Sequence, residues 1–447
     1  MTDTRPPLPN YDDALAKVLA FSPALSNEDV ALPDALGRVL RESLLADRDQ
    51  PAFHRSAMDG FALRSADFKA GATFLVTGVV AAGQAGWESF ADQQGILRIA
   101  TGAPLPSTFD VVIPIEKANV SKSGSNESVT FMTESVKPWQ HIHKQATDAE
   151  KGQILIPAGT RIAPQHIGIA ASAGATHIKV ASRPRITLLT SGDEVRPYNT
   201  QTADLESQQI RNSNGPMLQA LLQMLGTPII EHIHTPDEPE QTLVSAREAL
   251  AKSHIVITVG GVSVGQRDLL PWAWKQLGLG TVLHGVAIQP GKPVLVCSDA
   301  IDSKPNVNVS QPQTLSDKGT HPTKDDALPC KLAIGLPGNP VSVLATAHLF
   351  VWPVIRRMLM GAAHEAFDVL PWRNVPLADQ VTPKPARELF RTATLNQAGE
   401  AELVQWHGSG DLAHTSTASG FVRLPKQSDP LPAGSLVPFL PSIGGGM

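Results

Sequence analysis

Three short apolar runs, each followed by a glycine-containing loop, constrain the fold of this chain most. They are Arg185 to Leu189, Ile255 to Val259 and Lys331 to Leu336, and the loops after them read T-S-G-D-E, G-G-V-S-V-G-Q-R-D and P-G-N-P. Such runs predict strands buried on both faces of a parallel sheet. Because ligands of open α/β sheets bind beyond the carboxyl ends of the strands, we expect these loops to share one crevice.

Polar residues in these loops are candidates for ligand contacts. We expect Glu194, Asp268 and Asn339 to face the crevice, and Asp268 to open a helical segment that runs up to Gly278. Glycines let the backbone approach a ligand closely, and free N–H groups at a helix start attract phosphate or another oxyanion. From the residues alone, a tight βα turn without a ligand explains the Gly260-Gly261 pair equally well.

The rest of this α/β region adds one cation and two predicted helix starts. Lys292 lies in a Pro-Gly-Lys-Pro turn, which would present its charge to an anion, although exposed lysines are usually only solvated. Asn214 is predicted to cap a helix that ends before Gly226. Asp237, with Glu240 three residues later, predicts the start of a second helix, either as a capping box or as a plain N-cap.

The N-terminal third combines short helices with many short strands. Helices are expected at Tyr11 to Leu19 and around Leu32 to Leu40, and residues 119–128 are expected at a hairpin tip. The Ser56-Ala57-Met58-Asp59-Gly60 stretch predicts an Asx-type turn before a strand. Thr101, after another strand, is a candidate hydroxyl donor. His141 and His143 could pair on a metal, but the sequence offers no third ligand.

These patterns predict a multidomain fold of the α/β and β classes, with a central open, mostly parallel sheet. The expected parts are a linking and dimerisation domain (1–50 and 140–182), a β-rich domain (51–139), an α/β domain (183–362) and a small C-terminal β domain (363–447). Residues 299–329 are polar with almost no aliphatic run, which predicts a disordered insertion.

Composition narrows the class of protein. The 447 residues are 42% hydrophobic and 18% charged, which is typical of a globular protein with real cores. A net charge of −5 argues against a general nucleic-acid binder but allows a local basic pocket. No apolar run is expected to span a membrane, and no signal peptide is expected, so we predict a cytoplasmic protein. Two cysteines, Cys297 and Cys330, argue against a disulfide scaffold or a structural zinc site.

Seven motifs occur in an order that resembles a known family. They are Ser56 to Ala62 (S-A-M-D-G-F-A), Ile99 to Pro106 (I-A-T-G-A-P-L-P), Pro157 to Thr160 (P-A-G-T), Thr190 to Glu194 (T-S-G-D-E), Gly260 to Gly265 (G-G-V-S-V-G), Pro290 to Pro293 (P-G-K-P) and Pro337 to Ser342 (P-G-N-P-V-S). Together they resemble the MoeA-type molybdopterin molybdenumtransferases, to which the C-terminal part of gephyrin also belongs. The resemblance covers nearly the whole chain.

The resemblance implies a reaction, a metal and an assembly. Members of this family insert molybdate into adenylylated molybdopterin and release AMP, assisted by a divalent cation such as Mg²⁺. It also implies a four-domain subunit and a homodimer whose site is shared between subunits. A molybdopterin adenylyltransferase and apo-molybdoenzymes would be further partners, with neither nucleic acid nor membrane involved.

The resemblance also implies which residues act. Catalytic residues would be Asp59, Thr101, Glu194, Asp237 and Asp268, of which Glu194, Asp237 and Asp268 would hold the metal. Residues that bind the substrates would be Asp148, Ser191, Gly192, Gly260, Gly261, Ser263, Gly265, Lys292, Pro337, Gly338, Asn339, Pro340, Ser342, Arg391 and Ser409, with Arg387 as a further anion contact.

The chain departs from the family pattern before Asp148. Members often carry Arg-Gly-Glu-Asp there, whereas this chain has H-K-Q-A-T-D from His143 to Asp148. Two alternatives are a molybdopterin adenylyltransferase and a non-catalytic, gephyrin-like scaffold. The flanking β domains argue against the first, and the presence of Glu194 and Asp268 argues against the second.

Overall fold

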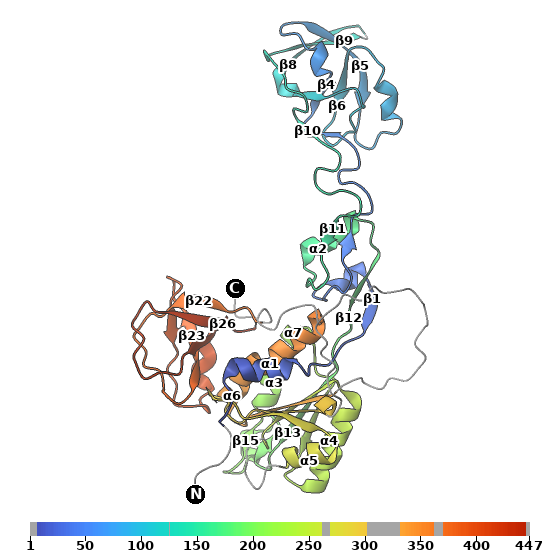
Figure 1. Ribbon diagram of the computed structural model, residues 1–447. Helices are drawn as coiled ribbons and strands as arrows, with labels where there is room; N and C mark the ends of the chain where they lie inside the picture. The colour runs from blue at the N-terminus through green and yellow to red at the C-terminus, as the bar shows by residue number, and fades with distance from the viewer. Residues whose placement is uncertain (1–6, 125, 262–268, 302–330, 362–369, 444–447) are drawn as a thin grey trace. The chain divides into compact units, whose positions relative to one another are not determined.

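The chain forms two compact units in a computed structural model, which describes residues 7–124, 126–261, 269–301, 331–361 and 370–443 (Figure 1). The first unit comprises Met1–Glu28, Gly37–Val39 and Val180–Met447, and the second comprises Asp29–Leu36 and Leu40–Lys179. Each unit has its own sheets and cores.

A six-stranded sheet organises the first unit, in the order β16-β13-β17-β21-β20-β18. The strands are β13 (Ile186–Ser191), β16 (Glu231–Thr235), β17 (Ile255–Val259), β18 (Gly280–His284), β20 (Leu295–Ser298) and β21 (Leu332–Leu336). The first four in the order are parallel, whereas β20 is antiparallel to both of its neighbours. The register pairs Thr190 with Val259 and Val259 with Leu336, so β13, β17 and β21 end at one sheet edge as predicted.

Helices cover both faces of this sheet because the strand side chains alternate between two cores. Leu188 packs with α1, α3 and α7, whereas the adjacent Leu189 packs with α4 and α5, and both leucines are fully buried. The helical segments are α1 (Tyr11–Leu19), α3 (Asn214–Met224), α4 (Pro239–Lys252), α5 (Leu270–Gln276), α6 (Pro340–Thr346), a π-helical turn (Ala347–Val351) and α7 (Trp352–Met360).

The first helix belongs to the core of this unit. Tyr11 and Val18 are buried among the sheet residues, and the Tyr11 hydroxyl donates a hydrogen bond of 3.2 Å to the carbonyl of Leu349. The prediction that residues 1–50 belong to a linking domain is therefore wrong for α1. An amphipathic helix near the chain end docks wherever a complementary apolar face is available, and its own sequence does not identify that face.

The helical stretch Pro340–Met360 is long and apolar enough to cross a membrane, which contradicts the expectation that no run reaches this length. Within this stretch, 72% of the most apolar window is buried inside the protein. Val343, Phe350 and Ile355 each lie fully buried in the core. Burial on all sides explains the apolar composition, and a core helix passes the same test of length and hydropathy as a membrane helix.

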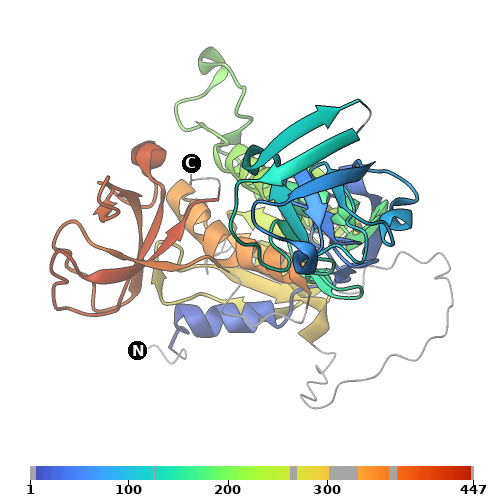
Figure 2. The same ribbon diagram turned by 90° about the horizontal axis from the view of Figure 1, so that it is seen from above.

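A second sheet of the first unit contains the C-terminal strands in the order β19-β23-β25-β26-β22, with β24 beside β23. They are β19 (Ile288–Gln289), β22 (Arg373–Pro376), β23 (Glu388–Leu395), β24 (Ala401–Leu403), β25 (Gly420–Leu424) and β26 (Leu436–Pro441). In Figures 1 and 2 alike, its red strands lie beside the orange segment α6–α7, and His348 contacts Phe421 there with ring centroids 5.2 Å apart. Because β19 pairs with β23, the α/β segment contributes one strand to this sheet.

The second unit contains a six-stranded sheet in the order β7-β4-β6-β5-β9-β8. Its strands are β4 (Gly60–Leu63), β5 (Thr73–Val80), β6 (Ile96–Ile99), β7 (Val111–Pro114), β8 (Ala118–Ser123) and β9 (Asn126–Phe131). Phe61 and Ala62 are both fully buried but belong to different apolar clusters, so both faces of the sheet are covered. Residues 119–128, expected at a hairpin tip, lie mostly within β8 and β9 themselves.

Short elements complete the described part of the chain. The paired strands are β1 (Asn27–Ala31) with β12 (His177–Ala181), β2 (Leu44–Leu45) with β11 (Ile154–Ile156), β3 (Arg55–Ser56) with β10 (Ile142–His143), and β14 (Val195–Arg196) with β15 (Ile210–Arg211). The one α-helix described in the second unit is α2 (Pro164–Ser172). The helix expected around Leu32 to Leu40 is only a 3₁₀ turn at Leu32–Ala35. Further 3₁₀ turns are Ser65–Asp67, Trp87–Phe90, Ile115–Lys117, Thr202–Asp204, Asp299–Ile301 and Ala413–Thr417.

Both predicted helix caps are wrong, and the Asn214 side chain has another partner. The carboxamide of Asn212, not Asn214, accepts a hydrogen bond from the N–H of Gly215 at 2.8 Å, and Asn214 instead donates to the carbonyl of Gly338. α4 begins after Glu238 without a side-chain cap, which leaves Asp237 in the loop before the helix. A capping pattern cannot distinguish a cap from a nearby acceptor in another loop.

The predicted insertion begins later than its composition indicated. Asp299–Ile301 forms a 3₁₀ turn, and Ile301 packs against the core of the first unit. The backbone N–H of Lys331 donates to the Asp299 carboxylate at 2.8 Å, which closes the end of the β20–β21 pair. Residues 302–329 lie outside the described residues, as does Cys330, whereas Cys297 is a buried free thiol whose pKa burial raises to about 11.

Candidate functional site

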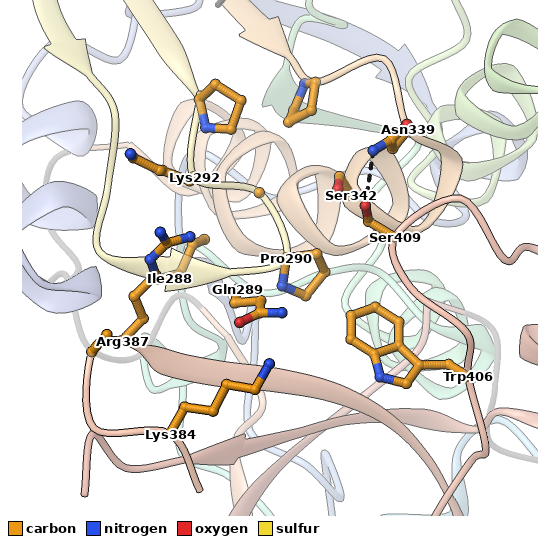
Figure 3. A pocket seen from close by; sticks show the side chains of 14 residues that line it. Ile288, Gln289, Pro290, Lys292, Asn339, Ser342, Lys384, Arg387, Trp406 and Ser409 are labelled. Atoms are coloured by element: carbon orange, nitrogen blue, oxygen red, sulfur yellow. Dashed lines mark hydrogen bonds between the residues drawn. The ribbon is translucent and has the colours of Figure 1, made fainter.

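A pocket of ≈ 390 Å³ lies in the first unit beyond the carboxyl end of β21, between the central sheet and the C-terminal sheet (Figure 3). Three sets of loops contribute to it: the turn after β19, the loop and helix start after β21, and loops of the C-terminal sheet. The residues that matter for its chemistry are Gln289, Lys292, Pro337, Asn339, Ser342, Lys384, Arg387, Trp406 and Ser409. Of the three loops predicted to share one crevice, the loop after β21 lines this pocket through Pro337 and Asn339, whereas Glu194 and the Gly260-Gly261 pair are not among its lining residues.

The Pro337 to Pro340 loop is held from both sides. Asn339 donates from its side chain to the hydroxyl of Ser409 at 2.8 Å, a contact drawn in Figure 3. The N–H of Val341 donates to the Ser409 carbonyl at 3.0 Å, and Asn214 donates to the Gly338 carbonyl at 2.8 Å. Pro340 begins α6. The loop is therefore fixed against both α3 and the C-terminal sheet.

Three cationic side chains gather at this pocket. Lys292 is exposed on the turn after β19, where Gly291 has φ +104° and an added Cβ would lie 2.3 Å from the Thr346 methyl carbon. Glycine is therefore needed for the turn to pack against α6. Lys384 and Arg387 enter from the segment before β23, and the Lys384 ammonium points toward Gln289 in Figure 3. Such a group of cations favours an anionic ligand.

Sequence reasoning overlooked Gln289, Lys384 and Trp406 as pocket residues. Lys384 stands directly between two prolines, and Lys292 lies in a similar Pro-Gly-Lys-Pro turn. The signal that identified Lys292 could therefore have identified Lys384 as well. Gln289 and Trp406 carry no comparable signal, because only the pairing of β19 with β23 brings their segments to this pocket.

Arg391 lies behind Trp406 and is absent from the described pocket lining. Its guanidinium carbon is 4.9 Å from the centroid of the Trp406 ring, and it donates to the Val404 carbonyl at 3.1 Å. Burial lowers the pKa of Arg391. Arg391 thus packs against the Trp406 ring, whereas the sequence analysis expected Arg391 to contact the substrate directly.

Carboxylates gather at the ends of β13 and β16. The N–H of Asp237 donates to an Asp193 carboxylate oxygen at 3.3 Å, and Glu194 follows directly in the same loop. Desolvation raises the pKa of Asp237, and the nearby negative charges of Asp193 and Glu194 raise it further. We call Asp193, Glu194 and Asp237 the acidic corner. Repulsion among these groups favours binding of a proton or a cation.

The first two glycine loops meet between the acidic corner and the pocket. Gly260 and Gly261 have φ of +84° and +64°, and a Cβ on Gly260 would contact the Ser191 hydroxyl at 3.4 Å. Gly192, at φ +126°, follows Ser191 and lies against the Glu194 carboxylate. The structure thus brings together Ser191, Gly192, Gly260 and Gly261, as expected. Ser263, Gly265 and Asp268 lie outside the described residues.

In the second unit, Asp59 and Thr101 meet although 42 residues separate them. The backbone N–H of Thr101 donates to the Asp59 carboxylate at 2.7 Å, and hydrogen bonds from Thr101 hold the pKa of Asp59 below its usual value. The expected Asx-type turn occurs in its serine form, because the Ser56 hydroxyl accepts from the N–H of Met58 at 3.3 Å and donates to the Met58 carbonyl at 2.6 Å. Gly60 is required there, since a Cβ would lie 2.1 Å from the Ile113 carbonyl oxygen.

Asp148 also lies in the second unit, exposed, with Oδ1 2.9 Å from Nε2 of His143. Arg55 contacts the other ring nitrogen of His143 at 3.3 Å. Among the residues that the structure describes, no group of three or more metal ligands includes His141 or His143. The histidine pair therefore has no metal-site geometry there.

Comparisons with known proteins agree with these features. Residues 9–174 match the MoeA N-terminal region (domain I and II), and residues 187–357 match a probable molybdopterin binding domain. The chain is 31% identical to the molybdopterin molybdenumtransferase of Synechococcus elongatus, over 92% of this chain and 94% of the relative. It is 30% identical to that of a Synechocystis species, over 95% of this chain and 98% of the relative.

The fold has a solved counterpart. The molybdopterin biosynthesis MoeA protein of Pyrococcus horikosii superimposes with a TM-score of 0.75 at 25% identity, covering 97% of this chain and 99% of that protein. Its match extends through the multidomain arrangement of mixed sheets and helices. With the two matched regions and the relatives of similar length, the chain belongs to the molybdopterin molybdenumtransferase family.

Proposed function

We propose that this protein is a molybdopterin molybdenumtransferase, which inserts molybdate into adenylylated molybdopterin and releases AMP during molybdenum cofactor biosynthesis. The single observation that carries the proposal is the cationic pocket at the carboxyl end of β21, in a chain that matches transferases along nearly its whole length. An enzyme that joins molybdate to a phosphate-bearing substrate needs such a site for anions.

The pocket suits both anionic substrates. Molybdate and phosphate oxygens accept charge-assisted hydrogen bonds, which Lys292, Lys384 and Arg387 can donate. The planar guanidinium of Arg387 can bind two oxygens at once, whereas the lysines act as compact charges. The half-buried Trp406 ring, supported by Arg391, offers a flat apolar face to the pterin or the adenine. These contacts would position the substrates for transfer.

We further propose that Mg²⁺ binds at the acidic corner. Desolvation, and then the negative charges of Asp193 and Glu194, raise the pKa of Asp237, and a divalent cation would relieve the repulsion among these carboxylates. Carboxylate oxygens are also the ligands that Mg²⁺ prefers. Glu194 and Asp237 would hold the ion, with Asp268 as a third predicted ligand. When bound, the cation would neutralise negative charge on the phosphate oxygens.

The test is a direct assay of AMP release. The purified protein is mixed with adenylylated molybdopterin, molybdate and Mg²⁺, and AMP is measured by chromatography. We expect release that depends on both molybdate and the divalent cation. An adenylyltransferase would consume ATP with molybdopterin instead, and a scaffold would do neither. AMP release that is independent of molybdate would contradict the proposal, as would its absence with active substrate.

A homodimer with a site shared between subunits is a further proposal. The family resemblance supports it, and Asp59 and Thr101, which meet in the second unit, are the residues that each copy would supply. In a two-fold dimer, each copy would supply this pair to its partner. Asp59→Ala and Glu194→Ala are prepared separately, each expected to be inactive, and are then mixed to allow subunit exchange.

The mixed sample distinguishes the two arrangements. In a heterodimer with shared sites, one site carries both substitutions and the other carries neither. Random mixing of equal amounts should therefore restore about a quarter of wild-type activity. If native mass spectrometry confirms exchange and no activity returns, Asp59 acts within its own chain. The partners that supply the substrate and accept the product, an adenylyltransferase and apo-molybdoenzymes, stay predictions, as does the cytoplasmic location.

A further inference from the structure

A second cluster of metal-ligating side chains lies outside the proposed site, in the loop between β24 and β25. Oδ2 of Asp411 is 3.0 Å from Nδ1 of His407, and Oδ1 is 2.7 Å from Nδ1 of His414. The two imidazole rings have centroids 5.0 Å apart. One ligand atom from each of the three residues lies within 4.8 Å of the others. We call these three residues the His-Asp-His cluster.

The loop itself builds this cluster. The backbone N–H of His407 donates to Asp411 Oδ2 at 2.9 Å, and the N–H of Asp411 donates to the Gly408 carbonyl at 3.1 Å. Gly408 has φ +130°, a conformation that favours glycine and folds the loop back on itself. The Asp411 side chain is only 15% exposed, whereas those of His407 and His414 are 68% and 44% exposed. A fixed carboxylate therefore sits between two imidazoles at the protein surface.

The spacing of these ligand atoms is close to that of a zinc-type site. Zn²⁺ binds histidine nitrogen and carboxylate oxygen at about 2.0–2.2 Å, so neighbouring ligands of a tetrahedral ion are roughly 3.3–3.5 Å apart. The nitrogen–oxygen distances of 3.0 and 2.7 Å run to different oxygens of Asp411, so a single ion would bind both oxygens or require one imidazole to move toward the oxygen that the other contacts. Exposed imidazoles can make that adjustment by small side-chain rotations.

The donor set selects the class of metal. Imidazole nitrogen suits Zn²⁺, Cu²⁺, Ni²⁺ and Co²⁺, whereas Mg²⁺ prefers oxygen ligands in an octahedral arrangement. The His-Asp-His cluster therefore differs in kind from the all-carboxylate acidic corner. With three protein ligands, a fourth position would remain open to water or another small ligand.

We propose that His407, Asp411 and His414 bind one borderline divalent transition-metal ion of the Zn²⁺ type. The ion would accept the Nδ1 lone pairs of the two imidazoles, each of which would then carry its proton on Nε2. The same loop carries Trp406 and Ser409 into the cationic pocket, and Ser409 holds Asn339 there. Metal binding would therefore stiffen the segment that closes one side of the pocket, independently of Mg²⁺ at the acidic corner.

Binding is tested with the untagged, chelator-treated full-length protein and Zn²⁺ alone. Isothermal titration should reveal one tight site for each chain, and His407→Gln or His414→Gln should each weaken it by at least about 100-fold. The double variant should lose the site. Co²⁺ provides a second readout, because a low-symmetry nitrogen and oxygen site gives visible absorption bands that the double variant should lack. His284→Gln, which changes an exposed histidine on β18, is the matched control and should bind as the wild type does.

The alternative is that the cluster is only a hydrogen-bonded network. In that case Zn²⁺ would bind the wild type weakly and without defined stoichiometry, or a tight site would survive in the double variant. Either result would overturn the proposal. Equal melting temperatures in the absence of metal would show that the variants fold. Hydrogen exchange in the wild type should show Zn²⁺-dependent protection concentrated in residues 404–417. Because none of these measurements uses activity, they remain separate from the test of the transferase reaction.

Discussion

The acidic corner and the cationic pocket lie at the same edge of one sheet but carry opposite charges. The first follows β13 and β16 and offers Asp193, Glu194 and Asp237, whereas the second lies beyond β21 and offers Lys292, Lys384 and Arg387. The uncharged Gly260-Gly261 loop follows β17, which is between β13 and β21 in the sheet. Parallel strands thus provide one common edge, while the loop sequences divide it into a cation region and an anion region.

This division suits a substrate that must be held by its charges at two places. Phosphate oxygens can bind a cation on one side and amino or guanidinium groups on the other, with backbone N–H groups of the glycine loops between them. The difference predicts that substitutions in the two regions will have different kinetic signatures. Loss of carboxylates should alter the dependence on the metal, whereas loss of cations should alter the dependence on the anionic substrates.

The largest effect is expected at the acidic corner. Glu194→Gln and Asp237→Asn should each lower AMP release on the order of 100-fold or more, because a metal ion bound to phosphate contributes several kcal/mol. The apparent affinity for Mg²⁺ should fall with it. Steady-state kinetics at varied Mg²⁺ measure both changes. Glu240→Gln, an exposed carboxylate in the first turn of α4, is the matched control and should behave as the wild type does.

Substitution of the pocket lysines should have a smaller effect of a different kind. Lys292→Met and Lys384→Met should each raise the KM for molybdate or for adenylylated molybdopterin by about 10- to 100-fold, the equivalent of one charge-assisted hydrogen bond. The Mg²⁺ dependence should stay unchanged. Lys275→Met on α5, also exposed, serves as the control. Equal loss of Mg²⁺ affinity in the pocket variants would break the proposed division of charge.

The aromatic face of the pocket should contribute less than its charges. Trp406→Leu should raise the KM for adenylylated molybdopterin by roughly 3- to 10-fold, because aromatic stacking contributes about 0.5–1.5 kcal/mol. The KM for molybdate should not change, since an oxyanion has no flat face to stack. Trp406→Phe should recover part of the loss. If Trp406→Leu impairs molybdate binding alone, the ring orders the lysines and does not bind the pterin or adenine.

The raised pKa of Asp237 predicts a small dependence of stability on pH. Between its ordinary and its raised pKa, Asp237 is more protonated in the folded protein than in the unfolded chain. The stability contribution of this group is therefore present at low pH and is lost as pH rises through the raised pKa. Asp237→Asn should remove that loss of stability. The change should be below about 1 kcal/mol, because Asp237 is largely exposed and its carboxyl group is only partly desolvated.

Urea unfolding between pH 4 and pH 7, without Mg²⁺, measures this effect. Added Mg²⁺ should stabilise the wild type more at the higher pH, since protons compete with the ion for the same carboxylates. The stabilisation should be weaker in Asp237→Asn. A wild-type profile that matches the variant at every pH would show that the acidic corner carries no electrostatic strain.

The smallest effect is expected from removing residues 302–330. These residues connect β20 to the start of β21, at the opposite end of β21 from the cationic pocket, so a short Gly-Asn turn in their place should leave both charged regions unchanged. Asp299 and Lys331 are retained because they bond across the end of the strand pair. Shortening a long connection alters closure entropy little. Calorimetry and the AMP assay test this, and a product that fails to fold would show that the segment packs against the first unit.

Local patterns were sufficient to predict the central strands and the order of their loops. β-branched runs and glycines act through backbone conformation and burial, which depend little on distant residues, so β13, β17 and β21 agree closely with their predicted bounds. Pairing at one sheet edge then follows from parallel topology. The same reasoning failed for the two helix caps, since Asn214 and Asp237 bond to loops that a local pattern does not reveal.

By itself, the sequence determined the α/β sheet, its glycine loops and the family resemblance, because these features depend on short contiguous motifs. Only the tertiary structure decided which distant segments meet. It buried Tyr11 against Leu349, joined Asp59 to Thr101, and brought Lys384 and Trp406 from the C-terminal sheet to the cationic pocket. These contacts join residues far apart in the chain, and their stability depends on complementary surfaces that form only when the separate elements pack together.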